Sequence, residues 1–481
     1  MIADLKPYAD YKESGLPWLG QVPGHWEVRR MKLLLREVDA RSTAGREQLL
    51  RVSQYTGVTR RKSVDGSDAP DTRASSLVGY KRVMPSDLVI NIMLAWNGSM
   101  GVSRYDGIAS PAYCVYRFKP GAIPWYYHEL LRLPVYKGRI KTASTGVVES
   151  RLRLYSDDLG RIEVIEPPLV EQAAIVRFLD WANGRLERAI RAKRKVIALL
   201  NEQKQAIIHR AVTRGLDPSV PLKPSGIPWL GDIPQHWEVR RTKFIVDHYG
   251  PGIQMGPFGS SLTQLAAVDT GFKLFGQENT ISGDFGRGNR WVTREQFEEL
   301  RRYELLPGDI VLTRKGSIGK ARLVPPGVAR GIADSDTIRV RLDKRQVEPT
   351  FIVELLHTST YVQRQIEATQ RGAVLGGLNT ATIGNLALVV PPLPEQLKLL
   401  VDLREATKDV VAGKERIERE IDLLREYRTR LVADVVTGKL DVREAAIRLP
   451  DEAAPDTSAE LAGEMLDDAD NLDEAERTEE I

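Results

Sequence analysis

Several short segments of the sequence combine basic side chains with glycine, a combination suited to binding a polyanion. The segment 313–320 (Thr-Arg-Lys-Gly-Ser-Ile-Gly-Lys) holds Arg314, Lys315 and Lys320 among glycines. Glycine lets a backbone approach a ligand closely, and Lys or Arg side chains neutralise phosphates. A plain hairpin turn is the alternative interpretation of this segment. A second glycine-rich segment, 250–261, carries Gln254.

Side-chain amides lie near basic residues at matching places in the two halves of the chain. Arg and Lys hydrogen-bond to guanine in the DNA major groove, whereas Gln and Asn do so to adenine. Each group taken alone is more typical of a solvated surface, and the recurrence makes a binding function an equally good interpretation. The candidate DNA contacts of this kind are Gln54, Arg60, Arg61, Lys62, Lys81 and Arg82 in the first half, and Gln277, Asn279, Arg287 and Arg290 in the second.

Catalytic signatures are missing from the sequence. No Gly-x-x-x-x-Gly-Lys-Ser/Thr loop for nucleotide phosphates occurs, and no His-x-x-x-His pair. Cys114 is the single cysteine. Segment 110–113 (Ser-Pro-Ala-Tyr) resembles an amino-methyltransferase signature, but Ala112 replaces its second proline, which favours the start of a strand. The sequence therefore predicts no catalytic residue, metal site or cofactor on this chain.

The composition indicates folded domains and a polyanionic partner. Of 481 residues, 42% are hydrophobic and 28% are charged, which is ordinary for globular proteins. The net charge of +4 conceals an asymmetry: residues 451–481 carry 13 acidic residues and one basic residue, so residues 1–450 carry a net charge of +16. The acidic tail is predicted to be disordered. Neither a secretion signal nor a long apolar run is found, so we expect a cytoplasmic protein without a membrane partner.

The chain contains an internal duplication. Segments 14–32 (SGLPWLGQVPGHWEVRRMK) and 225–243 (SGIPWLGDIPQHWEVRRTK) are identical at 14 of 19 positions. Farther along, Pro-Pro-Leu-Val-Glu-Gln at 167–172 matches Pro-Pro-Leu-Pro-Glu-Gln at 391–396. A repeat of more than 200 residues is too long for a solenoid unit and indicates two whole domains of one design. His25 and His236 recur between Pro and Trp, and we expect them to have structural roles.

Each copy ends in a long helix. The proline-poor segments 169–215 and 393–438 carry apolar residues at heptad spacing, which favours a coiled-coil-like pair. Two separate amphipathic helices, each on its own domain, are the alternative. An antiparallel pair would place the two globular domains at opposite ends of helices on the order of 60 Å long, related by a pseudo-two-fold axis. The residues predicted to pair the helices are Leu186, Ile190, Ile197, Leu200 and Ile207 in the first helix, and Ile417, Ile421, Leu424 and Leu431 in the second.

The globular parts, 1–168 and 218–392, are predicted to be mixed α/β (α+β) domains. Short β-branched runs follow turn signals, as at 88–93 after Pro-Ser-Asp and at 309–313 after Pro-Gly.

Taken together, these motifs resemble the specificity subunit of type I restriction–modification systems, over residues 11–442. The shared motifs are the Ser-Gly-Ile-Pro-Trp-Leu-Gly segment with its His-Trp-Glu-Val-Arg-Arg extension, the Pro-Gly-Asp-Ile-Val strand, the Gly-Pro-Phe-Gly-Ser loop, and Pro-Pro-Leu-x-Glu-Gln before a long helix. The resemblance implies two target recognition domains, each reading one half of a split sequence in double-stranded DNA, with the helices setting the spacer. The acidic tail departs from a minimal family member.

The resemblance also implies partners and excludes catalysis by this chain. Subunits of this family are non-catalytic and bind two adenine methyltransferase (modification) subunits. They also help to recruit a restriction subunit that translocates DNA. S-adenosylmethionine, ATP and Mg²⁺ are then expected on the partner subunits. The alternatives are the specificity subunit of a type IIB-like system and a scaffold without sequence-specific DNA binding.

Overall fold

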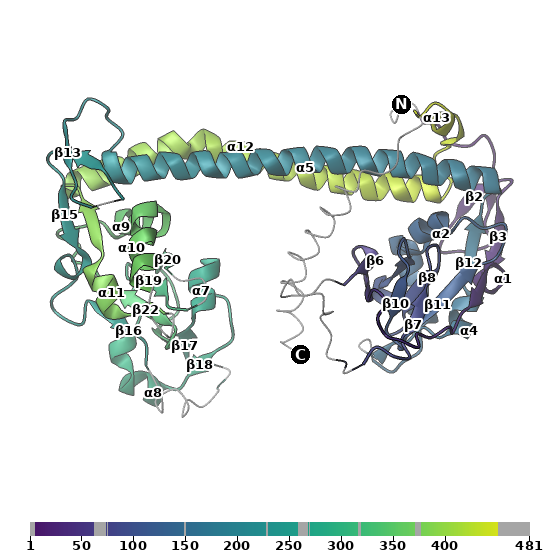
Figure 1. Ribbon diagram of the computed structural model, residues 1–481, viewed down its shortest axis with the longest axis horizontal. Helices are drawn as coiled ribbons and strands as arrows, with labels where there is room; N and C mark the ends of the chain where they lie inside the picture. The colour runs from purple at the N-terminus through teal and green to yellow at the C-terminus, as the bar shows by residue number, and fades with distance from the viewer. Residues whose placement is uncertain are drawn as a thin grey trace. The chain divides into compact units, whose positions relative to one another are not determined.

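The structure is a computed structural model that describes residues 5–61, 74, 76–148, 151–227, 229–257, 268, 270–315, 319–370 and 377–450. It divides into two compact units (Figure 1). The first unit contains residues 1–192 and 420–481, and the second contains residues 193–419. The acidic tail, Lys62 and parts of both glycine-rich segments (258–261 and 316–318) lie outside the described residues.

The first unit is built from short strands and helices followed by one long helix. Its elements are β1 (Tyr11–Glu13), β2 (Gln21–Pro23), β3 (Glu27–Arg30), α1 (Met31–Leu34), β4 (Leu35–Glu37), β5 (Leu50–Ser53), β6 (Gly57–Arg60), β7 (Lys81–Val83), β8 (Leu88–Asn91), the 3-10 turn η2 (Ala95–Asn97), β9 (Met100–Val102), β10 (Gly107–Ala109), β11 (Tyr113–Phe118), α2 (Pro124–Leu131), α3 (Pro134–Ala143), α4 (Ser156–Arg161), β12 (Glu163–Glu166), the start of α5 (Leu169–Arg214), the end of α12 (Leu393–Val436) and α13 (Arg443–Ile447).

The second unit follows the same plan with different insertions. Its elements are the end of α5, β13 (Leu222–Pro224), β14 (Asp232–Pro234), β15 (Glu238–Arg241), η4 (Thr242–Phe244), β16 (Ile253–Met255), β17 (Phe272–Phe275), α7 (Gln277–Ser282), β18 (Trp291–Val292), α8 (Arg294–Glu299), η5 (Arg301–Tyr303), β19 (Ile310–Thr313), β20 (Ala321–Leu323), β21 (Gly331–Ala333), β22 (Thr337–Val340), α9 (Pro349–Thr358), α10 (Thr360–Gln370), α11 (Thr380–Asn385), β23 (Ala387–Val390) and the start of α12.

A four-stranded antiparallel sheet is common to both units. Its strand order is β4-β11-β8-β9 in the first unit and β16-β22-β19-β20 in the second. The buried carboxylate of Asp87 accepts two hydrogen bonds from Arg117 (2.9 and 3.0 Å), and Asp309 accepts two from Arg341 (both 2.7 Å). Bidentate pairs of this kind fix strand register as well as charge. Two similar mixed α/β domains with long helices confirm the predicted fold class.

The repeated His-Trp and Glu-Gln motifs meet in the structure. Glu171, at the start of α5, accepts a hydrogen bond from the Trp26 indole (2.9 Å) and lies 2.7 Å from His25 Nε2. In the second unit Glu395 does the same with Trp237 (3.0 Å) and His236 (2.7 Å). The structural role expected for both histidines is confirmed: they attach β2–β3 and β14–β15 to the first turn of a long helix.

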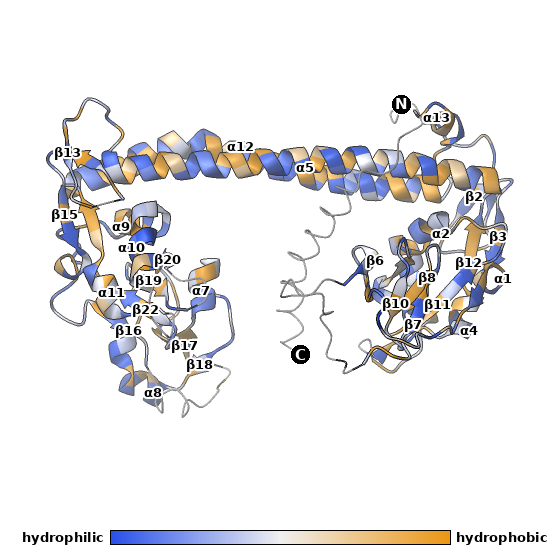
Figure 2. Cartoon of the chain, viewed as in Figure 1, coloured by the Kyte–Doolittle hydropathy of each residue, from blue (hydrophilic) through white to orange (hydrophobic). Residues whose placement is uncertain are grey.

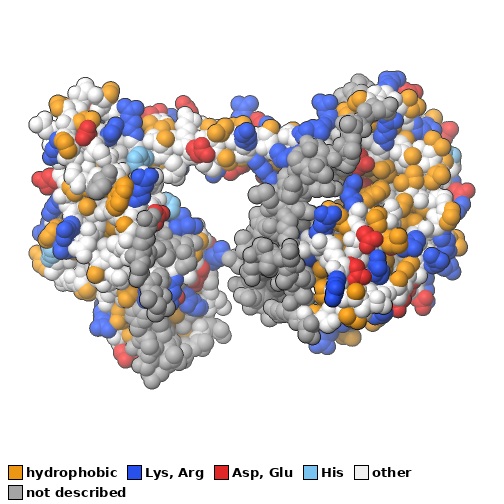
Figure 3. Space-filling view, in the orientation of Figure 1, with side chains coloured by type: hydrophobic (Ala, Val, Ile, Leu, Met, Phe, Trp, Pro, Cys, Tyr) orange, Lys and Arg blue, Asp and Glu red, His pale blue; other side chains and the backbone are white. Residues whose placement is uncertain are grey.

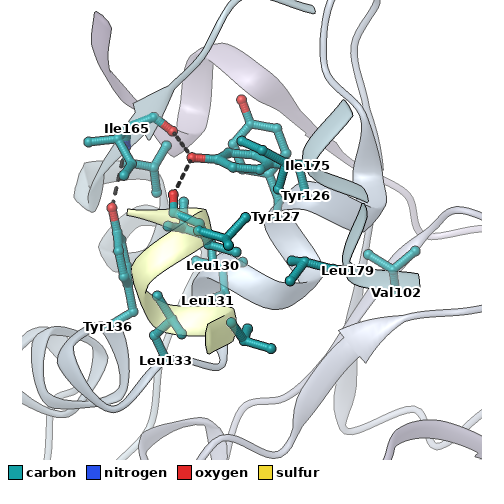
Figure 4. Close-up of a cluster of buried hydrophobic side chains, with 14 of the residues drawn as sticks. Val102, Tyr126, Tyr127, Leu130, Leu131, Leu133, Tyr136, Ile165, Ile175 and Leu179 are labelled. Atoms are coloured by element: carbon teal, nitrogen blue, oxygen red, sulfur yellow. Dashed lines mark hydrogen bonds between the residues drawn. The ribbon is translucent and has the colours of Figure 1, made fainter. Parts of the chain in front are cut away.

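Each hydrophobic core includes the ends of both long helices. In the first unit Ile175 and Phe178 of α5 and Val435 of α12 are buried with residues of α2 and α3. Tyr126 shows the packing directly, because its hydroxyl lies within hydrogen-bonding distance of two backbone oxygens, those of Ile165 (3.3 Å) and Val436 (3.2 Å) (Figure 4). The second core likewise includes parts of both helices. Figure 2 shows the corresponding alternation of hydrophobic and hydrophilic residues along α5 and α12.

Within each unit the two long helices lie alongside each other. In the first unit Arg428 of α12 lies 3.4 Å from Glu187 of α5. Farther along α12, Val436 shares the Tyr126 hydroxyl with Ile165, which comes just before α5, so the helices are antiparallel there. In the second unit a Cβ on Gly413 would lie 3.9 Å from Leu200. Of the residues predicted to pair the helices, Leu186, Ile190, Ile421 and Leu431 are buried, whereas Ile197, Leu200, Ile207, Ile417 and Leu424 are half-buried.

Among the described residues, every helix is either too short or too polar to cross a lipid bilayer.

Candidate nucleic-acid interface

Two of the predicted DNA contacts, Gln54 and Arg60, lie on the β5–β6 hairpin of the first unit. Its two strands pair antiparallel, and Tyr55 at the turn is exposed. Arg132, at the end of α2, holds this turn through its guanidinium. It donates to the backbone oxygens of Gln54 (3.0 Å) and Tyr55 (2.6 Å) and to that of Met100 (2.7 Å). One fork-shaped side chain therefore joins the hairpin turn to the start of β9.

Cations stacked on aromatic rings lie beside the hairpin. The Arg60 guanidinium lies 4.7 Å from the centre of the Tyr105 ring, and that of Arg104 lies 4.3 Å from the Trp125 ring. Arg stacked on an aromatic ring is held in place while its N–H groups stay available to an acceptor. This layer of stacked pairs, Arg60 on Tyr105 and Arg104 on Trp125, suits a surface that contacts DNA phosphates and bases.

A cavity of about 250 Å³ lies next to this layer, lined in part by Thr56, Arg104, Trp125 and Asp180. His128 also lines it and accepts a hydrogen bond from the Val102 N–H at Nδ1 (3.0 Å). Burial, with the nearby cations of Arg132 and Arg104, lowers the pKa of His128 to about 3. This histidine is therefore neutral at physiological pH, and it supports β9 rather than adding positive charge.

The other predicted contacts of the first unit differ in accessibility. Lys81 is buried on β7 with its ammonium 3.4 Å from Asp39, so it is poorly placed to meet DNA. Arg82 lies between Glu47 (3.6 Å) and Asp106 (3.5 Å). Arg61 is exposed after β6, and its backbone N–H donates to Leu49. Lys62 lies outside the described residues.

Replacing Arg132 tests whether the hairpin contacts DNA. Arg132→Ala leaves five backbone oxygens, those of residues 53, 54, 55, 98 and 100, without this donor and lets the turn move. We therefore expect the free energy of DNA binding to weaken by roughly 1–3 kcal/mol at one half-site and not at the other. The measurement is binding of the chain to duplexes mutated in one half-site or the other. Arg132→Lys, which keeps the charge but not the fork, is expected to lie between wild type and Arg132→Ala. Equal loss at both half-sites would contradict the expected role.

In the second unit the predicted contacts lie around a short acidic loop, 334–336, between β21 and β22. Arg290 lies 2.8 Å from Glu278 and 2.9 Å from Asp334. Lys315 lies 3.2 Å and Arg314 3.8 Å from Asp336. The structure thus brings together residues from two separate segments of the sequence, each cation matched by a carboxylate. A DNA phosphate is also an oxyanion that accepts hydrogen bonds from Arg and Lys, so it can take the place of such a carboxylate.

Asn279 holds a loop instead of presenting its amide. Its Oδ1 accepts from the Gly276 N–H (3.0 Å), and its Nδ2 donates to the backbone oxygens of Asp284 and Arg287 (both 2.9 Å). The residue is buried, so direct contact with a base is a poor interpretation of it. Asn279 holds the loop that ends at Arg287, which is exposed. Its influence on DNA binding would therefore come through the position of Arg287.

The remaining predicted contacts of the second unit are partly buried. Gln254 Oε1 already accepts a hydrogen bond from Arg339 (2.9 Å), so the N–H groups are the more available part of this side chain for DNA. Gln277 starts α7, and its Oε1 is buried without a hydrogen-bond partner among the described residues. Lys320 is half-buried beside Thr313, whose hydroxyl accepts from the Lys320 backbone N–H (3.2 Å).

Removing Asp336 is expected to strengthen DNA binding. Asp336→Asn frees Arg314 and Lys315 from a partly exposed ion pair, a type of contact worth about 0.2–1 kcal/mol. Affinity for DNA of any sequence should therefore rise by about two- to fivefold at low salt, with a steeper salt dependence. Fluorescence anisotropy at several salt concentrations measures both. As a control, Asp157→Asn changes an exposed carboxylate of α4 in the other unit. An unchanged or weaker affinity of Asp336→Asn would show that this loop lies away from DNA.

The residues that position the candidate contacts carry no signal in the sequence pattern. Neither Arg132 nor Arg339 stands in a glycine-rich or amide-containing basic segment. Arg339 is buried and donates to the backbone oxygens of Arg302 and Glu304 (3.0 and 2.9 Å). Burial, together with the nearby cation of Arg341, lowers the pKa of Arg339 to about 10. Only the fold shows that these arginines meet loops distant in sequence.

Comparisons with known proteins agree with this architecture. No family model matches the chain. The type I restriction enzyme MjaVIII specificity subunit of Methanocaldococcus jannaschii is 22% identical over 451 residues, covering 90% of this chain and 97% of the relative. The type I restriction enzyme StySPI specificity subunit of Salmonella potsdam is 23% identical over 430 residues, covering 84% and 86%.

Among solved structures, one from work on complex assembly and conformational transition of the type I R-M system aligns with a TM-score of 0.58 at 16% identity. The alignment covers 87% of this chain and 99% of that one. This likeness supports the fold. The matches to these curated relatives extend over most of this chain and most of each relative. In sequence, the chain is similar over most of its length to specificity subunits of type I restriction enzymes.

Proposed function

We propose that each unit reads one half of a bipartite DNA sequence, and that α5 and α12 set the number of base pairs between the halves. The observation that carries this proposal is the duplicated four-stranded sheet, because its two copies support different candidate contacts. The first unit presents an antiparallel hairpin, β5–β6, whereas the second presents α7 and a parallel pair of strands, β17 and β21. Two similar scaffolds with unlike binding surfaces suit two unlike half-sites.

The charge of the chain supports contact with DNA. Residues 1–450 carry a net charge of +16, and Figure 3 shows Lys and Arg side chains spread over the visible face of both units. Phosphate contacts supply affinity and position, whereas contacts to base edges supply the sequence preference. The chain itself is non-catalytic in this proposal, in line with its similarity to specificity subunits.

Methylation and cleavage are then carried out by partner subunits. We propose that the chain binds two copies of an adenine methyltransferase subunit, partly through α5 and α12, and that it helps to recruit a restriction subunit that translocates DNA. S-adenosylmethionine, ATP and Mg²⁺ would bind to those partners. The exposed Leu199 of α5 and Leu423 of α12, at equivalent positions of the two repeats, are suitable contacts for a protein that binds twice.

Selection from random DNA tests this proposal. The full chain, purified with the methyltransferase subunit from the same genome, is used to enrich duplexes from a random library. Enrichment of two short sequences at one fixed separation is the expected result. Enrichment of a single uninterrupted sequence, or of none, would contradict the proposal.

A further inference from the structure

The C-terminal segment is held at a defined place on the first unit. Ala445, Ala446 and Leu449 are buried in the first hydrophobic core. The guanidinium of Arg177, on α5, donates to the backbone oxygen of Leu449 (3.0 Å), one residue before the described part of the chain ends. The acidic tail, residues 451–481, therefore starts beside this turn of α5.

The same turn of α5 borders the candidate nucleic-acid interface of the first unit. Val176, Leu179 and Asp180 line the cavity beside the β5–β6 hairpin, together with Arg104. Asp180 comes three residues after Arg177, so the two are neighbours on the helix surface, and its carboxylate lies 4.0 Å from the Arg104 guanidinium. The tail thus leaves the folded chain close to the stacked arginines of this unit, Arg60 and Arg104.

The two units differ in how their candidate cations are balanced. In the second unit a carboxylate of the 334–336 loop lies 2.9, 3.8 and 3.2 Å from Arg290, Arg314 and Lys315. In the first unit Arg60 stacks on a tyrosine ring and makes no ion pair within the described ranges. Asp180 is beyond hydrogen-bonding distance of Arg104. Two exposed, fixed cations therefore have little local counter-charge in the unit that carries the acidic tail.

The tail has the charge and the length to supply this counter-charge. It holds 13 carboxylates and one basic side chain in 31 residues. An extended chain covers about 3.3 Å per residue, so the tail can span on the order of 100 Å, more than enough to cross one hairpin. Because it is tethered, its effective concentration at a nearby surface is on the order of millimolar. Carboxylates and DNA phosphates bind the same guanidinium N–H groups.

We propose that the acidic tail binds the surface formed by Arg60 and Arg104 in the first unit, and that DNA has to displace it there. The contact itself concerns this chain alone, whereas the competition with DNA rests on the proposed function. A tail bound in this way lowers the affinity of the first unit for every DNA sequence. Only duplexes that make favourable base contacts then stay bound.

Hydrogen exchange tests the contact in the absence of DNA. The full chain is compared with an amide-tail variant, in which every Asp and Glu of residues 451–481 is replaced by Asn or Gln. Amides of the β5–β6 turn, residues 54–56, should exchange at least about threefold more slowly in the full chain, whereas those of α7 should exchange equally. Equal exchange at the turn would overturn the proposal.

Two pairs of substitutions locate the contact. Arg60→Gln with Arg104→Gln in the full chain should raise exchange at the turn to the level of the amide-tail variant carrying the same two changes. Arg301→Gln with Arg330→Gln is the matched control, because it removes the same charge from exposed positions of the second unit and should keep the difference. A difference that persists without Arg60 and Arg104 would overturn the assignment of this surface.

DNA affinity, measured by fluorescence anisotropy, tests the competition. The amide-tail variant should bind a duplex of unrelated sequence about three- to tenfold more tightly at low salt, with a smaller difference at high salt. Tighter binding with unchanged exchange at the turn would overturn the proposal, because the tail would then repel DNA without docking. Slower exchange with unchanged DNA affinity would overturn the competition. A protected turn in a chain that binds no DNA, with or without the acidic tail, would confirm the contact and contradict the proposed function.

Discussion

Inserting seven residues into each of α5 and α12 should lengthen the DNA spacer and leave both half-sites unchanged. The insertions are placed after residues 192 and 419, where each helix passes from one unit to the other. Seven residues add about 10 Å of helix, the length of roughly three base pairs, and preserve the heptad pattern. Methylated sites mapped in cells expressing the variant measure both the half-sites and the spacer.

A second variant controls for added length as such. The same seven residues inserted at 218–220, between α5 and β13, lengthen a connection outside the helices and should leave the spacer as in wild type. A changed half-site in the helix variant, with the original spacing kept, would contradict the view that the helices set the distance.

Replacing Glu171 should destabilise the first unit more than replacing Glu395 destabilises the second. Glu171 is buried and meets Tyr8 (3.2 Å), His25, Trp26 and Arg443 (3.4 Å). Glu395 meets only His236 and Trp237 among the described residues, and it is more exposed. Glu171→Ala leaves buried donors without an acceptor, so we expect a loss of about 3 kcal/mol in unfolding free energy, against about 1 kcal/mol for Glu395→Ala.

Hydrogen exchange measures this difference unit by unit, because a single unfolding curve would mix the two units. Amides of β2–β3 should exchange faster in Glu171→Ala, and those of β14–β15 should change less in Glu395→Ala. Glu171→Gln, which keeps one acceptor oxygen, should lie between. Equal effects of the two alanine variants would show that the additional partners of Glu171 add no stability.

Repetition made the architecture predictable from sequence. Two matched segments indicated two domains of one design, and the heptads after Pro168 and Pro392 indicated the helices now seen as α5 and α12. Such features depend on local periodicity and turn residues, which a sequence shows directly. Ile197 and Ile417, two of the residues predicted to pair the helices, are half-buried.

The candidate interface was much less predictable. The sequence pattern does not distinguish an exposed lysine from Lys81, which is buried against Asp39. Nor does it distinguish an amide side chain that contacts a DNA base from Asn279, whose amide holds a loop. Those distinctions depend on partners far away in the chain. The same is true of Arg132, whose importance comes from carbonyl groups of residues 54, 55 and 100.

Genome-wide mapping of adenine methylation tests the central claim most directly. The chain is expressed with the methyltransferase subunit from the same genome and compared with a strain lacking the chain. We expect a bipartite motif, two short specified sequences at one fixed separation, that disappears when the chain is removed. An active methyltransferase whose methylation pattern is the same with and without the chain would contradict the claim that this subunit reads DNA.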